Sequence, residues 1–174
     1  MKKLLIASLC ITAFALTACD KKTNDATSTT SQTTNTAQAS SLSHDNAGDI
    51  KSDLQQLQTL SNTKSQEALA FQDEATEAAQ KGEKPALEAL VKKMESYVTN
   101  FNKDLEGLNL KSSEASAVRD KMKKSNDLGL ALAKAGIETP PNMTKITGLQ
   151  KEATDLQQAL LADMQSLEIK VNGK

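Results

Sequence analysis

Few residues of this chain have side chains that could do covalent or acid–base chemistry. The cysteines are Cys10 and Cys19, and the only histidine is His44. Nucleophilic catalysis needs a thiol or hydroxyl held beside a base on a rigid scaffold. Cys10 lies within an apolar run and His44 lies in a segment rich in serine and threonine, so the sequence predicts no catalytic pair. The surroundings of Cys19 do indicate a reaction, because this residue directly follows the apolar run.

The sequence before Cys19 has the layout of an export signal. Lys2 and Lys3 precede an uncharged run at positions 4–18, which has the length of a signal-peptide core with its cleavage site. A transmembrane helix needs about 20 apolar residues, and the charges at positions 20–22 end this run first. The run closes on Leu16, Thr17, Ala18 and Cys19, which resembles the lipobox of bacterial lipoproteins.

The lipobox resemblance implies cleavage between Ala18 and Cys19 and transfer of a diacylglyceryl group to the Cys19 thiol, with further acylation of the new amino group. Each buried methylene contributes about 0.8 kcal/mol, so two or more chains hold a protein stably whereas one holds it reversibly. Cys19 is therefore the predicted lipidation site and membrane anchor. The alternative is a secreted protein cut by the ordinary signal peptidase, for which Ala13 and Ala15 offer small residues.

The resemblance places the protein in the bacterial cell envelope, lipid-anchored and facing the periplasm. Asp20 resembles an inner-membrane retention signal, but Lys21 and Lys22 follow it, so the choice between inner and outer membrane stays open. Loss of residues 1–18 leaves 19 basic and 22 acidic residues, a net charge near −3. These charges alternate in sign at helical spacing, so a nucleic acid is not an expected partner.

Composition divides the chain into three segments. They are a signal peptide at residues 1–18, a tether at residues 19–47 with the lipidated Cys19, and a helical domain at residues 48–174. The tether is rich in Ser, Thr, Asn and Gln and has Leu42 as its only large apolar residue, so it is expected to be disordered. A flexible coil of about 28 residues reaches roughly 30 Å.

Apolar residues beyond the tether recur at spacings of three and four, which predicts amphipathic helices. Short connections favour antiparallel neighbours, so the expected fold class is all-α, an antiparallel bundle of about four helices. The first helix is expected at residues 48–80, the second from Pro85 to a turn at Gly107, the third from a cap at Ser112 or Ser113 to Gly136, and the fourth from Thr139 or Asn142 almost to the C-terminus.

Acidic residues near the start of the first helix are candidate metal ligands. Asp45, Asp49 and Asp53 recur every four residues beside His44 and could hold a cation weakly on one helical face. An acidic first turn favoured by the helix dipole is the simpler interpretation. The helical domain contains no histidine, which argues against haem, di-iron and zinc sites. The prediction is therefore no metal and no cofactor.

The leading functional prediction is a non-catalytic interaction or structural protein. The predicted partners are the membrane, through acyl chains on Cys19, and a periplasmic or envelope protein. The predicted contact face is on the first helix, where Leu60, Leu69 and Phe71 lie partly outside the apolar stripe. The sequence does not determine the oligomeric state, and the helical domain resembles no specific family.

Two other function classes stay open. The main alternative is a small-molecule or stress-ligand binding module with a pocket between the helices, because alanine-rich layers could leave a cavity. The third class is an envelope enzyme acting through carboxylates such as Asp73, Glu74 and Glu77, although a solvated helix face explains these residues better.

Overall fold

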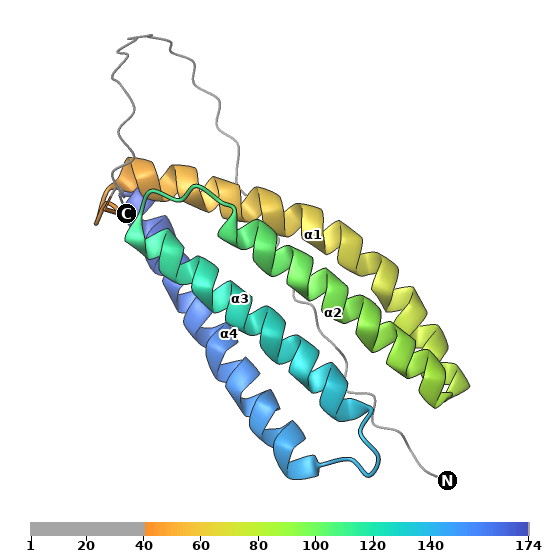
Figure 1. Cartoon of the computed structure of the whole chain (residues 1–174). Coiled ribbons are helices and arrows are strands. Elements are labelled where there is room, and N and C mark those ends of the chain that lie inside the picture. The colour runs from red at the N-terminus through yellow and green to blue at the C-terminus, as the bar shows by residue number, and fades with distance from the viewer. Residues whose placement is uncertain (1–40, 174) are drawn as a thin grey trace.

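A computed structural model describes residues 41–173 and shows four helices and no strand within that range. Consecutive helices run in opposite directions and pack side by side, which gives an antiparallel bundle (Figure 1). The predicted all-α bundle is therefore confirmed. The helices are α1 (Ala47–Lys81), α2 (Lys84–Glu106), α3 (Ser113–Gly136) and α4 (Met143–Asn172).

The helix ends coincide with residues whose local chemistry stops or starts a helix. The side-chain oxygens of Asn46, Ser112 and Asn142 accept hydrogen bonds from free backbone N–H groups in the first turns of α1, α3 and α4. Pro85 lies in the first turn of α2, where its missing N–H costs nothing. Gly82 ends α1 with φ of 62°, a left-handed conformation that glycine adopts without strain. Pro85, Ser112 and Asn142 are also residues on which the expected bounds rest, whereas the cap at Asn46 was not predicted.

The four helices form two hairpins that meet at one end and spread apart at the other (Figure 1). We call the first end the closed end: α1 and α3 begin there, and α2 and α4 finish there. We call the other the open end, where the turn at Gly82 and the connection at residues 137–142 lie well apart in the view. Within residues 41–173, no helix combines the length and the apolar character that crossing a bilayer requires.

The main apolar core lies towards the closed end, because its members come from the first half of α1 and α3 and the second half of α2 and α4. Several buried residues nearer the open end are alanines, which remove less apolar area from water: Ala68, Ala78 and Ala135, beside the larger Val91 and Leu128. The bundle is therefore held together mainly at the closed end. The core comprises Ile50, Leu57, Phe101, Leu105, Leu110, Ala115, Val118, Leu160 and Leu167.

Ion pairs accompany three of the four helix–helix contacts around the bundle. In the part of the chain that the structure describes, no ion pair joins α1 to α4, and these two helices also touch over a shorter stretch than the other neighbours. The remaining pairs are Lys64–Asp104 and Lys93–Glu74 for α1 and α2, Lys123–Glu106 and Lys134–Glu95 for α2 and α3, and Lys121–Asp163 and Lys124–Glu152 for α3 and α4.

Candidate functional site

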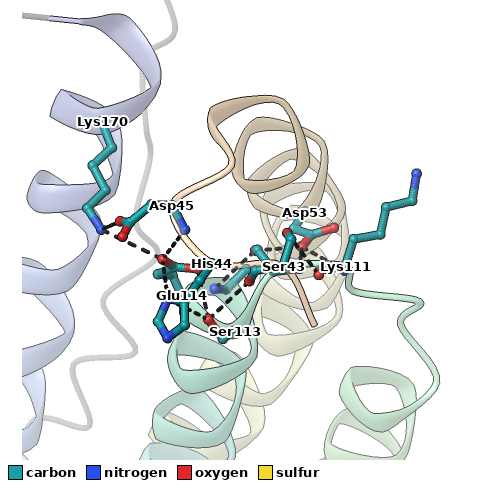
Figure 2. Close-up of polar contacts among 10 residues, drawn as sticks. Ser43, His44, Asp45, Asp53, Lys111, Ser113, Glu114 and Lys170 are labelled. Atoms are coloured by element: carbon teal, nitrogen blue, oxygen red, sulfur yellow. Dashed lines mark hydrogen bonds and ion pairs between the residues drawn. The ribbon is translucent and has the colours of Figure 1, made fainter. Parts of the chain in front are cut away.

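The densest group of polar contacts lies at the closed end, where the chain enters the bundle. Figure 2 shows residues gathered from four places in the sequence: the segment before α1, α1 itself, the start of α3 and the end of α4. The Lys111 side chain points away from the others, and its backbone makes the contacts. We call this group the entry clasp. Its members are Ser43, His44, Asp45, Asp53, Lys111, Ser112, Ser113, Glu114 and Lys170.

The segment before α1 is joined to the start of α3 through its backbone. Ser43 N–H donates to the Lys111 carbonyl at 2.7 Å, and Ser113 N–H donates to the Ser43 carbonyl at 3.0 Å, which makes a short parallel bridge opposite Ser112. The Ser43 hydroxyl also lies 3.2 Å from the Lys111 carbonyl. These contacts correct the predicted tether, which was expected to continue to residue 47. Residues 43–46 belong to the folded part, because backbone groups bind there whatever the polarity of the side chains.

Asp53 occupies a fully buried position on α1 and binds the N-cap residue of α3, Ser112, together with the residue before it. Its Oδ2 accepts hydrogen bonds from Lys111 N–H at 2.8 Å, from Ser112 N–H at 2.7 Å and from the Ser112 hydroxyl at 2.7 Å. Backbone N–H groups at the beginning of a helix lack partners within the helix, and a carboxylate is a strong acceptor for them. Asp53 therefore fixes α1 against α3.

Glu114 lies at the centre of the contacts around the entering chain. Its Oε1 accepts a hydrogen bond from Asp45 N–H at 2.9 Å and lies 3.2 Å from His44 Nδ1 and 3.7 Å from Lys170 Nζ. The bond from Asp45 N–H is the main reason why the pKa of the Glu114 carboxyl is lowered from 4.5 to about 2. Lys170 also pairs with the Asp45 carboxylate, and this contact raises the pKa of the Lys170 ammonium. The carboxylate and the ammonium are therefore both held in their charged forms.

His44, Ser113 and Glu114 contain the residue types of a hydrolytic triad, but their geometry differs. The Ser113 hydroxyl and the Glu114 carboxylate both approach the same ring nitrogen, His44 Nδ1, at 3.3 and 3.2 Å. A relay needs the nucleophile on one ring nitrogen and the orienting acid on the other. The Ser113 hydroxyl also lies 3.0 Å from Glu114 Oε2, and the His44 side chain is 81% exposed. These contacts hold the entering chain, and their geometry differs from that of a catalytic relay.

The single helical face expected for Asp45, Asp49 and Asp53, the candidate metal ligands, does not form. Asp45 has φ of 55° and precedes α1, whereas Asp53 is buried against α3. The structure instead brings oxygen or nitrogen atoms of His44, Asp45 and Glu114 within 4.8 Å of one another. The ammonium of Lys170 already supplies a positive charge beside both carboxylates.

The sequence analysis did not identify Glu114, Lys170 or the role of Asp53. The first two come from regions that are distant in the sequence, since Lys170 lies 125 residues from Asp45. Asp53 had a usable signal: it follows Ile50 by three residues and precedes Leu57 by four, so it occupies an inward position of α1. A carboxylate in such a position needs buried donors.

The three residues of the predicted contact face on α1 differ in their exposure to solvent. Leu69 is 56% exposed, as the prediction requires. Leu60 instead packs against the core, and the Phe71 ring lies edge-on to Tyr97 with 5.3 Å between the ring centroids. Leu60 and Phe71 are both partly buried, and Leu60 also lines a surface hollow, so their part in a contact face stays a prediction.

The pocket expected by the alternative function can be compared with two surface hollows. One of about 510 Å³ lies along α1 beside Leu108, and its lining is mainly neutral and polar, with Ser52, Gln55 and Thr59 among its residues. A second of about 370 Å³ lies on α4 around Ile169. Both are shallow and lie on the outside of the bundle, so neither is a pocket between the helices.

The remaining predicted site residues, Leu16, Thr17, Ala18 and Cys19, lie outside the described residues. Comparison with known proteins bears on the helical domain. The family model described as "Uncharacterised lipoprotein PM1805" matches residues 51–172, which covers most of the four helices. No curated protein and no solved structure matches the chain significantly.

Proposed function

Since the chain belongs to the family of uncharacterised lipoprotein PM1805, and is thus a bacterial envelope lipoprotein, we propose that it is a non-catalytic interaction protein. In this proposal, acyl chains on Cys19 anchor it, the helical bundle faces the periplasm, and the bundle binds an envelope protein through its helices. No cofactor or metal is needed for that role.

The entry clasp is the observation that carries the proposal. The chain from the anchor reaches the bundle at the closed end, and there Ser43 and Asp45 are bound to the start of α3 and the end of α4. These contacts use backbone groups and charges that are paired with one another, so they favour attachment over catalysis. The clasp thereby directs the closed end towards the anchor and leaves the sides and the open end of the bundle accessible.

The anchor is tested first, because the rest of the proposal depends on it. Cys19→Ala, or treatment of cells with the lipoprotein signal peptidase inhibitor globomycin, should make the unprocessed precursor accumulate. Ser41→Ala, a substitution at an exposed position outside the clasp, is the matched control and should leave processing normal. Unchanged processing of Cys19→Ala would contradict lipidation at this residue.

The interaction role is tested by crosslinking the tagged, lipidated protein in cells and identifying the captured proteins by mass spectrometry. One dominant partner that is lost with Cys19→Ala would support the proposal. Capture of nothing by the lipidated protein would argue against it. Turnover of a cell-wall or envelope substrate by the purified protein would contradict the non-catalytic part.

A further inference from the structure

The connection between α3 and α4 ends on a tripeptide with the pattern of an N-glycosylation acceptor. Asn142, Met143 and Thr144 supply an asparagine, a residue other than proline, and a threonine. Sugar transferases recognise this pattern: the asparagine amide accepts the sugar, and a hydroxyl is needed two residues later. None of the other nine asparagines in the chain is followed by serine or threonine at that spacing. The sequence therefore contains one candidate acceptor of this kind.

A tripeptide of this pattern is common by chance, so its place in the fold decides whether a transferase can reach it. Its three side chains are all exposed, that of Met143 to 62%. Pro141 before it and Lys145 after it are exposed as well. The tripeptide lies at the open end of the bundle, where α4 begins, and so away from the entry clasp (Figure 1). An enzyme can therefore approach it from outside the bundle.

The backbone of the tripeptide can be straightened at little cost. Asn142 has φ of −88° and ψ of 91°, so it is already extended. Pro140 and Pro141 lack the N–H that would continue a helix backwards. Met143 is the first residue of α4, and the N–H groups of a first turn have no partner within the helix. Opening this turn breaks few backbone hydrogen bonds and gives a transferase an extended segment to bind.

The Asn142 amide uses only its oxygen within the fold. Oδ1 accepts a hydrogen bond from Lys145 N–H at 3.0 Å, which caps α4. Nδ2 donates to none of the residues that the structure describes. Attachment of a sugar replaces one hydrogen of Nδ2 and leaves Oδ1 unchanged. The sugar and the helix cap are therefore compatible in the folded protein.

We propose that Asn142 is an N-glycosylation site whose second substrate is a sugar activated by a diphosphate at C1. In the transfer, the bond from C1 to the diphosphate oxygen breaks, a bond from C1 to Asn142 Nδ2 forms, and the displaced Nδ2 proton passes to a base of the transferase. The diphosphate belongs either to a sugar nucleotide in the cytoplasm or to a lipid-linked sugar in the envelope. The proposal does not depend on the proposed protein partner, because it rests on the acceptor and its place in the fold.

A sugar at Asn142 changes what the open end of the bundle can bind. The sugar is hydrated and lies beside Met143, whose side chain is the most exposed of the large apolar ones in residues 41–173. It therefore shields this side chain from other apolar surfaces. The envelope partner of the proposed function then has the sides of the bundle available rather than this end.

Mass spectrometry of the full-length protein, isolated from the bacterium that makes it, tests the site. Trypsin releases residues 135–145 as one peptide, because Lys134 and Lys145 bound a stretch without lysine or arginine. This peptide separates Asn142 from the serine- and threonine-rich tether. We expect it to carry one or more sugar residues, located on Asn142 by fragmentation. A peptide found only in its unmodified form would overturn the proposal.

Three substitutions distinguish a sugar on the amide from a sugar on a nearby hydroxyl. Asn142→Asp removes Nδ2 but keeps an oxygen that caps α4, so the sugar should disappear while helical circular dichroism stays unchanged. Thr144→Ala should also abolish the sugar. Thr144→Ser, the matched control, preserves the acceptor pattern and should preserve the sugar. A sugar that persists in Asn142→Asp would lie on Thr139 or Thr144 and would overturn the proposal.

A chain that lacks residues 1–18 distinguishes the two sugar donors. Without the predicted signal peptide this chain should stay in the cytoplasm. Sugar on Asn142 of this chain would support transfer from a sugar nucleotide. Sugar on the exported chain alone would support transfer from a lipid-linked donor. If the peptide is unmodified while the full-length protein still captures an envelope partner, this inference fails and the proposed function stands.

Discussion

The carboxylate of Asp53 on α1 accepts both the backbone N–H and the hydroxyl of Ser112, each at 2.7 Å, and both residues are fully buried. One side chain thereby binds Ser112, the N-cap residue of α3, and joins it to a helix position that lies 59 residues earlier in the chain. The closed end of the bundle depends on this pair, because the entering segment is bound to the same stretch of backbone.

Asp53→Ala should lower the free energy of unfolding by about 2–4 kcal/mol, because it leaves several buried donors without an acceptor. Asp53→Asn should cost less, since an amide oxygen still accepts a hydrogen bond. Urea denaturation followed by circular dichroism measures both. Asp73→Asn, on the exposed side of α1, is the control and should change stability little. Equal free energies of unfolding for Asp53→Ala and the parent protein would show that the hydrogen bonds of the Asp53 carboxylate do not stabilise the fold.

Glu114 predicts how stability depends on acidity. Its pKa is about 2 in the folded protein against an ordinary 4.5, so the folded state binds the proton more weakly than the unfolded chain does. The stabilisation is therefore complete above about pH 5 and is lost as the pH falls towards 2. Glu114→Gln should destabilise the protein at pH 7 by roughly 1–3 kcal/mol and flatten the acid limb of the stability curve. Unfolding midpoints at several pH values compare the two.

The control for this pH series is Glu88→Gln, because Glu88 lies in an exposed pair with Lys84 at 3.7 Å. Exposed pairs contribute little, so its acid limb should match that of the parent protein. If Glu114→Gln and the parent protein lose stability in parallel between pH 5 and pH 2, the contacts of Glu114 do not stabilise the fold.

Tyr97 can be titrated on its own, because the chain has one tyrosine and no tryptophan. Burial is the main reason why the pKa of its phenol is raised above 10, and the nearby charge of Glu67 acts in the same direction. The hydroxyl donates to the Lys64 carbonyl at 2.8 Å. Ultraviolet absorbance should show the phenol ionising at higher pH in the folded protein than in urea. Coincident curves, with circular dichroism still helical, would contradict this placement.

Because the main apolar core lies towards the closed end, shortening a side chain there should cost more stability than shortening one at an exposed position. Leu105→Ala should cost about 3–4 kcal/mol, because Leu105 is fully buried among residues of the closed-end core. Leu69→Ala should change stability by less than about 0.5 kcal/mol, since that side chain is largely exposed. Thermal or urea unfolding distinguishes these outcomes, and similar losses at both positions would argue against a core confined to the closed end.

Local chemistry made the helices predictable. Periodic apolar residues place α2 and α4, and Ser112, Asn142 and Gly82 set helix ends through contacts within a few residues of themselves. Such contacts are visible in a short stretch of sequence. The choice between Ser112 and Ser113, and between Thr139 and Asn142, needed the structure because each candidate is a competent cap.

Long-range contacts were not predictable in the same way. Lys64 is a charged residue within the apolar stripe of α1, yet it is buried and pairs with Asp104 and Glu67. Residues 43–46 resemble the polar tether in composition, and their attachment depends on Glu114 and Lys170, which lie far away in the sequence. Amino-acid composition indicates how much apolar surface a segment can bury, but it does not predict which distant groups its backbone will bind.

The order of synthesis gives the entry clasp a consequence of its own. Residues 43–45 are made before the four helices, Glu114 follows only after two of them, and Lys170 lies near the end of the fourth. A contact that spans 125 residues closes only when everything between its ends has been made. The contacts of residues 43–45 with the start of α3 can therefore form once α3 has begun, whereas the contact with Lys170 must wait until α4 has been made as well.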